Sequence, residues 1–291
     1  MVNFPRCKIC NSKNLSFFIH TASCCDCGVL LCYPYPEIRE EKYLNRSKLT
    51  SNERKNIQTN SLEWHLKSGS RNHHNFTDMT LFAINNEDRR KNLSVLDYGG
   101  GGGQFALVLK SLFPKADNFI VDMDNGRLLD EFRPLNKQIK FEDFESDTQK
   151  FDVIFMNDVF EHVSFPIEVL TTLRSKLKEG GKIFIDTPCH FWLYPVTRIL
   201  SKKIHTKLLN GTVDYDHQQI WSKTSFEVAV KKAGLKVQKI TRLSEYTQGV
   251  DFYLNSMKIE KGVVRLAGKL FFWLAPYIAK NKIMAVVSID E

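Results

Sequence analysis

The sequence predicts an α/β protein built on a doubly wound, mostly parallel sheet of seven strands, with a small cysteine-rich head before it. From residue 93 onward, short apolar runs alternate with amphipathic segments of helix length, which is typical of a parallel sheet covered by helices on both faces. In addition, six of the seven cysteines lie within the first 32 positions. These two textures divide the chain into a head and a larger domain.

Each predicted element has a local cause. The first strand, 93–98, is an apolar run that ends at five consecutive glycines, and the helical pattern after it stops before Pro114. Pro166 is typical of a first helical turn, and Gly234 of a helix end. The predicted strands are 93–98, 118–122, 139–141, 151–156, 182–186, 235–243 and 283–289. A helical pattern runs from Phe105 to Pro114, and the other predicted helices are 125–133, 166–177 and 223–232. The last two strands are expected to form an antiparallel edge pair.

The composition limits the class of protein. Of 291 residues, 43% are hydrophobic and 25% charged, which excludes a disordered chain and a fibrous repeat. Lys and Arg outnumber Asp and Glu by 41 to 33, and this net charge of +8 permits an anionic partner without requiring one. Because residues 1–6 lack the character of a secretory signal and no run of 18 uncharged apolar residues occurs, we expect a cytoplasmic protein without a transmembrane segment.

The predicted organisation has three parts. Residues 1–36 form the head, 37–92 a charged helical linker, and 93–291 the α/β domain. Two insertions are expected within that domain, a lid at 188–221 and an amphipathic helix at 259–280. The basic residues of the lid would suit an anionic substrate, although an ordinary solvated helix face is the simpler explanation. They are Arg198, Lys202, Lys203 and Lys207.

The glycine row carries the strongest functional signal. Asp97 precedes it in the spacing Asp-x-Gly-x-Gly-x-Gly, with Gly99, Gly101 and Gly103 at the repeated positions, between a strand and a helix. Glycine allows a sharp turn and lets a ligand approach the backbone without a Cβ in the way. An acid before the first glycine would repel a pyrophosphate but suits a cationic ligand. The spacing therefore favours S-adenosylmethionine over a dinucleotide.

With the motifs that follow it, this turn resembles the class I S-adenosylmethionine-dependent methyltransferases, and the resemblance extends over most of the α/β domain. It implies that Asp122, followed by Met123, accepts the ribose hydroxyls at the end of the second strand. It further implies that Asp143 and Phe144 surround the adenine. Asn157, at the end of the fourth strand, would lie beside the methionine part of the cofactor. Alone, each piece has an ordinary explanation, such as a flexible turn or a helix cap.

Two Cys-x-x-Cys pairs, separated by thirteen residues, predict a zinc ribbon in the head. Four thiolates would hold a tetrahedral zinc of the structural kind, because no position is left for water. The expected ligands are Cys7, Cys10, Cys24 and Cys27. Asn11 and Gly28, after the second cysteine of each pair, can adopt the positive φ that such turns need. The alternative is a set of reactive or packed thiols, and Cys25 is a competing ligand.

The candidate catalytic residues are histidines and a tyrosine. The segment His217-Gln-Gln-Ile-Trp-Ser222 resembles the "His, three residues, aromatic, Ser/Thr" stretch of many small-molecule methyltransferases, in which the histidine faces the acceptor. His217 is therefore a candidate base or acceptor ligand, with Tyr215 nearby. His162, within the fourth-strand motif, is a second candidate base or else a structural neighbour of the cofactor. Ser222 is expected to cap the next helix.

The leading expectation is methyl transfer to a small-molecule, sugar or glycan/lipid-linked acceptor, with the zinc ribbon shaping the acceptor side. A ribbon joined to this core resembles sugar methyltransferases of bacterial glycan and natural-product pathways. Those that methylate carbon have a further C-terminal domain without a counterpart here, which favours transfer to O or N.

Two other functions remain open. An RNA methyltransferase could bind phosphates with the ribbon and its basic surface, but the Lys and Arg residues are interleaved with Asp and Glu along the chain. A non-catalytic module could bind S-adenosylmethionine without turnover. The amphipathic segment 263–279 could lie on a membrane surface, or pack on the sheet or a partner subunit.

Overall fold

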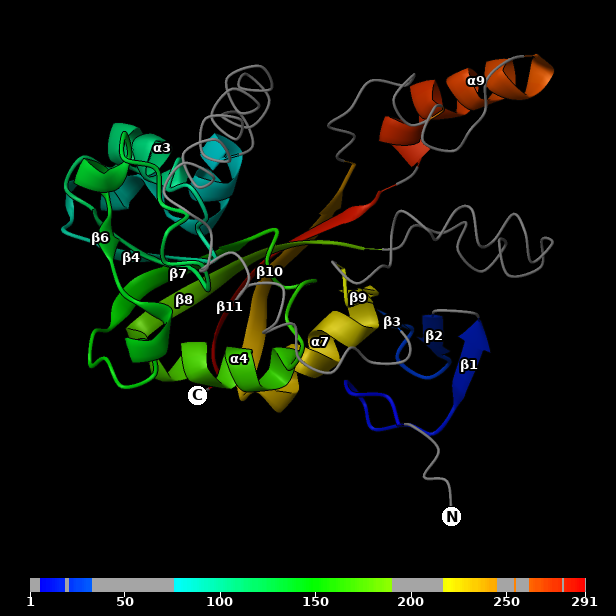
Figure 1. Ribbon diagram of the computed structural model, residues 1–291, viewed down its shortest axis with the longest axis horizontal. Coiled ribbons are helices and arrows are strands. Elements are labelled where there is room, and N and C mark those ends of the chain that lie inside the picture. Colours follow the sequence, from blue (N-terminus) through cyan, green and yellow to red (C-terminus); the bar gives the residue numbers. More distant parts are fainter. Residues whose placement is uncertain are drawn as a thin grey trace.

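The structure is a computed structural model that describes residues 6–18, 21–32, 76–189, 217–244, 254, 262–278 and 280–290. Tyr215 lies outside the described residues, as do most of the predicted lid and of the predicted linker. The described part consists of a small antiparallel sheet and a seven-stranded sheet with helices on both of its faces (Figure 1).

The larger sheet confirms the predicted fold class. Its strands lie in the order β10-β11-β8-β7-β4-β5-β6, and β11 alone runs opposite in direction to the other six. The strands are β4 (Ser94–Tyr98), β5 (Asp117–Val121), β6 (Lys137–Gln138), β7 (Phe151–Asn157), β8 (Leu177–Pro188), β10 (Leu235–Leu243) and β11 (Lys282–Ile289). As predicted, the last two strands pair antiparallel at one side of the sheet.

Two hydrophobic clusters, one on each face of the sheet, hold the helices in place. Successive residues of β8 alternate between them, with Ile183 and Ile185 in one cluster and Phe184 in the other. Helices α4 (Pro166–Ser175) and α7 (Lys223–Lys232) cover the first face. On the other face lie α3 (Phe105–Leu112) and the helical residues 76–83 (Figure 1). This arrangement brings the carboxyl ends of the parallel strands to one edge.

Two predicted elements after β5 are wrong. Residues 125–133 form turns and lead into the short 3₁₀ helix η2 (Arg133–Leu135), and 139–141 are replaced by β6 and the 3₁₀ helix η3 (Phe141–Asp143). The cause is local, because the Asp124 carboxylate accepts a hydrogen bond from the Gly126 N–H at 3.1 Å. Side-chain bonds of this kind favour turns over helices. A short connection therefore brings the chain from β5 to β6.

The head forms a sheet of its own and extends it with a strand of the large domain. β1 (Leu15–Phe18), β2 (Thr21–Cys24) and β3 (Leu30–Cys32) are antiparallel, and β3 pairs with β9 (Gln219–Ile220). The Ser222 hydroxyl donates a further hydrogen bond to the Cys27 carbonyl at 2.6 Å. The head is thus attached to the segment that begins at His217.

Helix α9 (Val263–Ile278) projects from the sheet (Figure 1). Several of its apolar side chains are exposed and form a stripe along the helix. The exposed residues are Val263, Leu266, Leu270, Trp273, Leu274 and Tyr277. Within the described residues, no helix is both long enough and apolar enough to cross a membrane. A contact of α9 with a membrane surface or with a partner subunit stays a prediction.

Candidate functional site

The glycine turn follows β4 and precedes α3. Gly99, Gly101 and Gly103, the three repeated positions of the motif, have φ values of 77°, 56° and 83°. A side chain at any of them would strain the backbone, because L-residues rarely adopt this region. Gly100 is needed for another reason, since a Cβ there would lie 2.4 Å from the Asp97 Oδ2 atom.

Two carboxylates face this turn from neighbouring strands. β4 and β5 are parallel, so Asp97, at the end of β4, and Asp122, directly after β5, lie at the same edge of the sheet. Asp97 is buried. The Asp122 carboxylate accepts hydrogen bonds from the N–H groups of Gly101, at 3.0 Å, and Asp124, at 2.9 Å. These bonds fix the orientation of Asp122 toward the turn.

The electrostatics of this pair favour a cation. Burial, and after it the charge of Asp122, raise the pKa of Asp97 to about 7. The negative charge of Asp122 disfavours ionisation of Asp97, and a cationic ligand between the two would offset this repulsion. The guanidinium of Arg127 lies only at the margin, with its Nη1 atom 4.0 Å from the Asp122 Oδ2 atom.

The other predicted cofactor residues occupy different environments. Met123, beside Asp122, exposes 48% of its surface. Asp143 is exposed in η3. Phe144 is buried, and its ring packs against Tyr98 with 5.7 Å between the centroids. The proximity of Phe144 to Tyr98 ties the segment after β6 to the end of β4.

Asn157 ends β7, next to β4 at the centre of the sheet. Among the described residues, neither its amide oxygen nor its amide nitrogen has a hydrogen-bond partner, although both atoms are buried. Buried amides are normally hydrogen-bonded. A polar part of a cofactor at this edge would satisfy the amide of Asn157.

The two candidate histidines within the described residues come together. The rings of His162, after β7, and His217, before β9, have centroids 4.9 Å apart. Glu161 joins them, since its Oε1 atom lies 3.8 Å from the Nε2 atom of His162. Glu161 is almost fully buried, and this burial, followed by the charge of Asp158, raises its pKa well above the ordinary value. Sequence reasoning did not single out Glu161.

Hydrogen bonds and ring stacking attach the segment after His217 to the loop after β7. The backbone N–H of Gln218 donates to the Glu161 carbonyl at 2.9 Å, and the Gln219 side chain donates to the Phe160 carbonyl at 2.6 Å. The Trp221 ring stacks on Phe160 at 4.4 Å. Sequence reasoning missed these glutamines, whose only signal is their position between His217 and the apolar pair Ile220 and Trp221. Ser222 caps α7, as predicted, by accepting a hydrogen bond from the Ser225 N–H.

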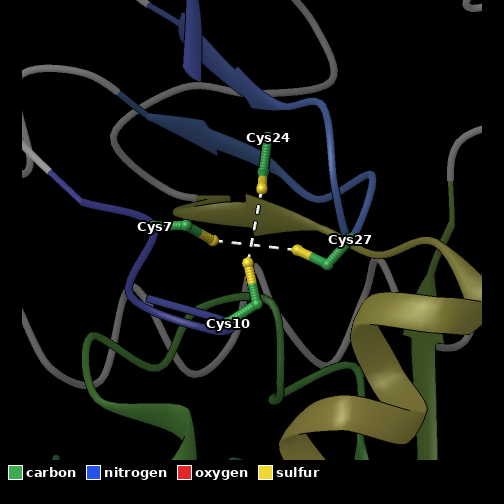
Figure 2. Close-up of side chains that lie close together, drawn as sticks. All are labelled: Cys7, Cys10, Cys24 and Cys27. Carbon is green, nitrogen blue, oxygen red and sulfur yellow. Dashed lines mark hydrogen bonds between the residues drawn. The ribbon is translucent and has the colours of Figure 1, made fainter. Parts of the chain in front are cut away.

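The four cysteines of the head point toward one centre (Figure 2). Their sulfur atoms all lie within 4.8 Å of one another, with 3.7 Å between Cys7 and Cys27 and 3.4 Å between Cys10 and Cys24. Zn–S bonds of about 2.3 Å in a tetrahedron place sulfur atoms about 3.8 Å apart, so the donor set fits zinc. The residues after the second cysteines, Asn11 and Gly28, have φ of 67° and 76°. The predicted turn geometry is therefore confirmed.

The remaining described cysteines lie apart from this cluster. Cys25 is exposed and does not belong to the group of four. Cys32 and Cys189 are buried, in line with packed thiols. The competition by Cys25 that the sequence left open is thus not favoured by the geometry.

The fold and the acidic glycine turn define a class I S-adenosylmethionine-dependent methyltransferase. A family model described as a methyltransferase domain matches residues 70–240, a range that holds the turn, both acids and the histidine pair. The chain belongs to this family.

Relatives with curated names share this range. A ubiquinone biosynthesis O-methyltransferase from Nitrosococcus oceani is 28% identical over 198 residues, covering 62% of this chain and 82% of that protein. A protein of the same name from Coxiella burnetii is 26% identical over 193 residues, which cover 62% of this chain and 80% of that protein. Among solved structures, coclaurine N-methyltransferase bound to N-methylheliamine and SAH has a TM-score of 0.51, with 14% identity and coverage of 74% and 72%. At that identity, the likeness concerns the fold alone.

Proposed function

We propose that this enzyme transfers the methyl group of S-adenosylmethionine to an oxygen or nitrogen of a small-molecule or saccharide acceptor, including a glycan or lipid-linked one. The observation that carries the proposal is the meeting of two sites at one sheet edge. The acidic turn, with Asp97 and Asp122, lies at the ends of β4 and β5. The histidine pair lies at the loop after β7, the neighbour of β4, where His162 meets His217. The names of the curated relatives support an oxygen acceptor.

The cofactor would lie across the glycine turn. Asp122 would accept the ribose hydroxyls, with Met123, Asp143 and Phe144 around the adenine. Asp97 and the unpaired amide of Asn157 would face the methionine part. The bound cofactor supplies an electrophilic methyl group on a sulfonium. The chain itself orients the two reactants and excludes water, which is where most of the acceleration of such a displacement arises.

The acceptor side would be formed by His217 and His162, with Tyr215 as a further candidate. The zinc of the ribbon would be structural, held by Cys7, Cys10, Cys24 and Cys27. Because β3 pairs with β9, the ribbon would keep His217 in position. The division into ribbon (1–36), linker (37–92) and methyltransferase domain (93–291), with insertions at 188–221 and 259–280, is part of this proposal, as is a cytoplasmic location.

The test is transfer of a labelled methyl group. The enzyme is incubated with methyl-labelled cofactor and fractions of bacterial small molecules, glycans and RNA. We expect label in a small-molecule or glycan fraction, and the His217→Ala variant should lose this transfer while its calorimetric affinity for S-adenosylhomocysteine stays unchanged. Label in RNA alone would favour the alternative function. A loss of cofactor affinity equal to the loss of transfer would remove His217 from the acceptor side.

Cofactor affinity should depend on pH through Asp97. With a pKa of about 7, this buried carboxyl is mostly neutral at pH 6 and mostly ionised at pH 8. A cation binds the ionised form better, so affinity for S-adenosylmethionine should fall by up to about tenfold as the pH drops from about 8 to 6. Binding near neutral pH should also release a proton, which calorimetry detects as an enthalpy that varies with the buffer. Asp97→Asn is the control, and a pH dependence that survives in it would exclude Asp97 as the cause.

A further inference from the structure

Three side chains from two distant segments form a second cluster of metal-ligating groups. Glu161, His162 and His217 each offer one ligand atom, and these atoms all lie within 4.8 Å of one another. The cluster lies at the edge of the large sheet and does not involve the ribbon cysteines. One carboxylate and two imidazoles are the donors that Zn²⁺, Fe²⁺, Mn²⁺, Co²⁺ and Ni²⁺ prefer in proteins.

The surrounding hydrogen bonds hold these donors in a defined arrangement. The hydroxyl of Thr187, in β8, donates to the Glu161 Oε2 atom at 3.0 Å, which leaves Oε1 on the side of His162. The backbone N–H groups of Gln218 and Gln219 both donate to the Glu161 carbonyl, at 2.9 and 3.3 Å. Residue 217 is therefore fixed to residue 161 by the backbone. Support of this kind orients ligands and raises metal affinity.

The charge at this place also favours a cation. Glu161 is 1% exposed, and a carboxylate at such a position is costly unless a positive charge compensates it. The lysine that lowers this cost, Lys282, forms its closest ion pairs with other acids, Asp186 at 2.7 Å and Asp158 at 3.0 Å. A divalent ion next to Oε1 would compensate Glu161 directly.

We propose that Glu161, His162 and His217 bind one divalent transition-metal ion, separate from the zinc of the ribbon. Bonds of about 2.0–2.2 Å place the ligand atoms of such an ion about 3–3.5 Å apart. The observed distance from the Glu161 Oε1 atom to the His162 Nε2 atom is 3.8 Å, slightly longer than this range. Three protein ligands leave at least one coordination position open, as in catalytic metal sites.

The open position identifies the class of acceptor, and this step rests on the proposed function. A ligand with a hydroxyl, or with two adjacent oxygens, would bind the ion and present an oxygen toward the cofactor. A metal ion lowers the pKa of a bound hydroxyl, which makes its oxygen a better nucleophile at neutral pH. As metal ligands, His162 and His217 would act on the acceptor through the ion and not as free bases.

The test is calorimetric titration with Co²⁺ of the full-length protein that carries one zinc per chain, held by the four ribbon thiolates, followed in parallel by visible absorption. We expect one added equivalent of Co²⁺, without the intense thiolate-to-cobalt absorption that exchange into the ribbon would produce. His217→Ala and Glu161→Gln should weaken this binding by more than about 100-fold, the upper range for loss of a supporting group. Asp130→Asn, which removes an exposed carboxylate elsewhere, is the matched control and should bind as the wild type does.

Two results would overturn the site: no Co²⁺ uptake beyond the ribbon, or uptake that is unchanged in both variants. Affinity for S-adenosylhomocysteine serves as the check that each variant is folded, and Glu161→Gln keeps the size of the side chain. Metal binding is measured without methyl transfer, so the two proposals fail separately. Co²⁺ binding without transfer of label to any acceptor would contradict the proposed function alone, whereas transfer without a second metal would contradict this inference alone.

Discussion

Cys24→Ser is expected to remove the zinc and unfold the ribbon. Cys24 is buried and its sulfur lies 3.4 Å from that of Cys10, so the variant leaves three thiolates around the ion. A small head has little core of its own, and structural zinc in such modules supplies about 10–16 kcal/mol of apparent binding energy. We expect about one zinc fewer per chain than in the wild type by elemental analysis. Amides of β1, β2 and β3 should lose their protection from hydrogen exchange.

Unfolding of the ribbon should also disturb the acceptor side of the active site, because β3 is the pairing partner of β9. The Cys32 N–H donates to the Gln218 carbonyl at 2.9 Å, immediately after His217. Methyl transfer should therefore fall with zinc content, while affinity for S-adenosylhomocysteine at the distant glycine turn changes little. Cys25→Ser is a closely matched control, since it makes the same change one residue away at an exposed thiol. Equal zinc loss in both variants, or full zinc in Cys24→Ser, would contradict the assignment.

Asp122→Ala should weaken binding of S-adenosylhomocysteine by about 1–3 kcal/mol, roughly a factor of 5 to 150. The reason is the loss of a carboxylate that would accept the ribose hydroxyls and that already accepts the Gly101 N–H at 3.0 Å. Without it, the turn also loses one of its supports. Calorimetric titration measures the change directly.

Asp117→Ala is the control for this variant. Asp117 begins the same strand and is half exposed, with an ion pair to Lys137 at 3.0 Å that contributes little at the surface. The affinity of the Asp117→Ala variant for S-adenosylhomocysteine should equal that of the wild type. Unchanged affinity in Asp122→Ala, with the thermal midpoint preserved, would remove Asp122 from the cofactor site.

Elements with a strong local signal were predicted closely. The bounds of α7, at 223–232, and of β10, at 235–243, agree with the prediction, because Ser222 caps that helix and Gly234, with φ of 71°, ends it. The region after β5 was mispredicted for a related reason. Its few apolar residues suggested a helix, but side-chain bonds of Asp124 to the backbone stabilise a turn there.

Some residues of the candidate site could likewise be predicted from local sequence, and others could not. Asp97 and the glycine turn are contiguous, and Asp122 follows the next strand of a parallel sheet, so spacing along the chain was enough to bring them to one edge. The same holds for the four ribbon cysteines, whose two pairs are each closed by a local turn. Such groups are predictable because covalent connection and secondary structure alone determine their geometry.

The meeting of Glu161 and His162 with His217, in contrast, was decided by tertiary structure. These residues are far apart in sequence, and no local pattern links them. They meet because β9 pairs with a strand of the cysteine-rich head and because Gln218 and Gln219 bind the loop after β7. The amino-acid pattern was sufficient for the fold class and the cofactor edge, which arise from short-range periodicity and turns. The acceptor side required long-range strand pairing and side-chain packing, whose free energy depends on the folded molecule as a whole.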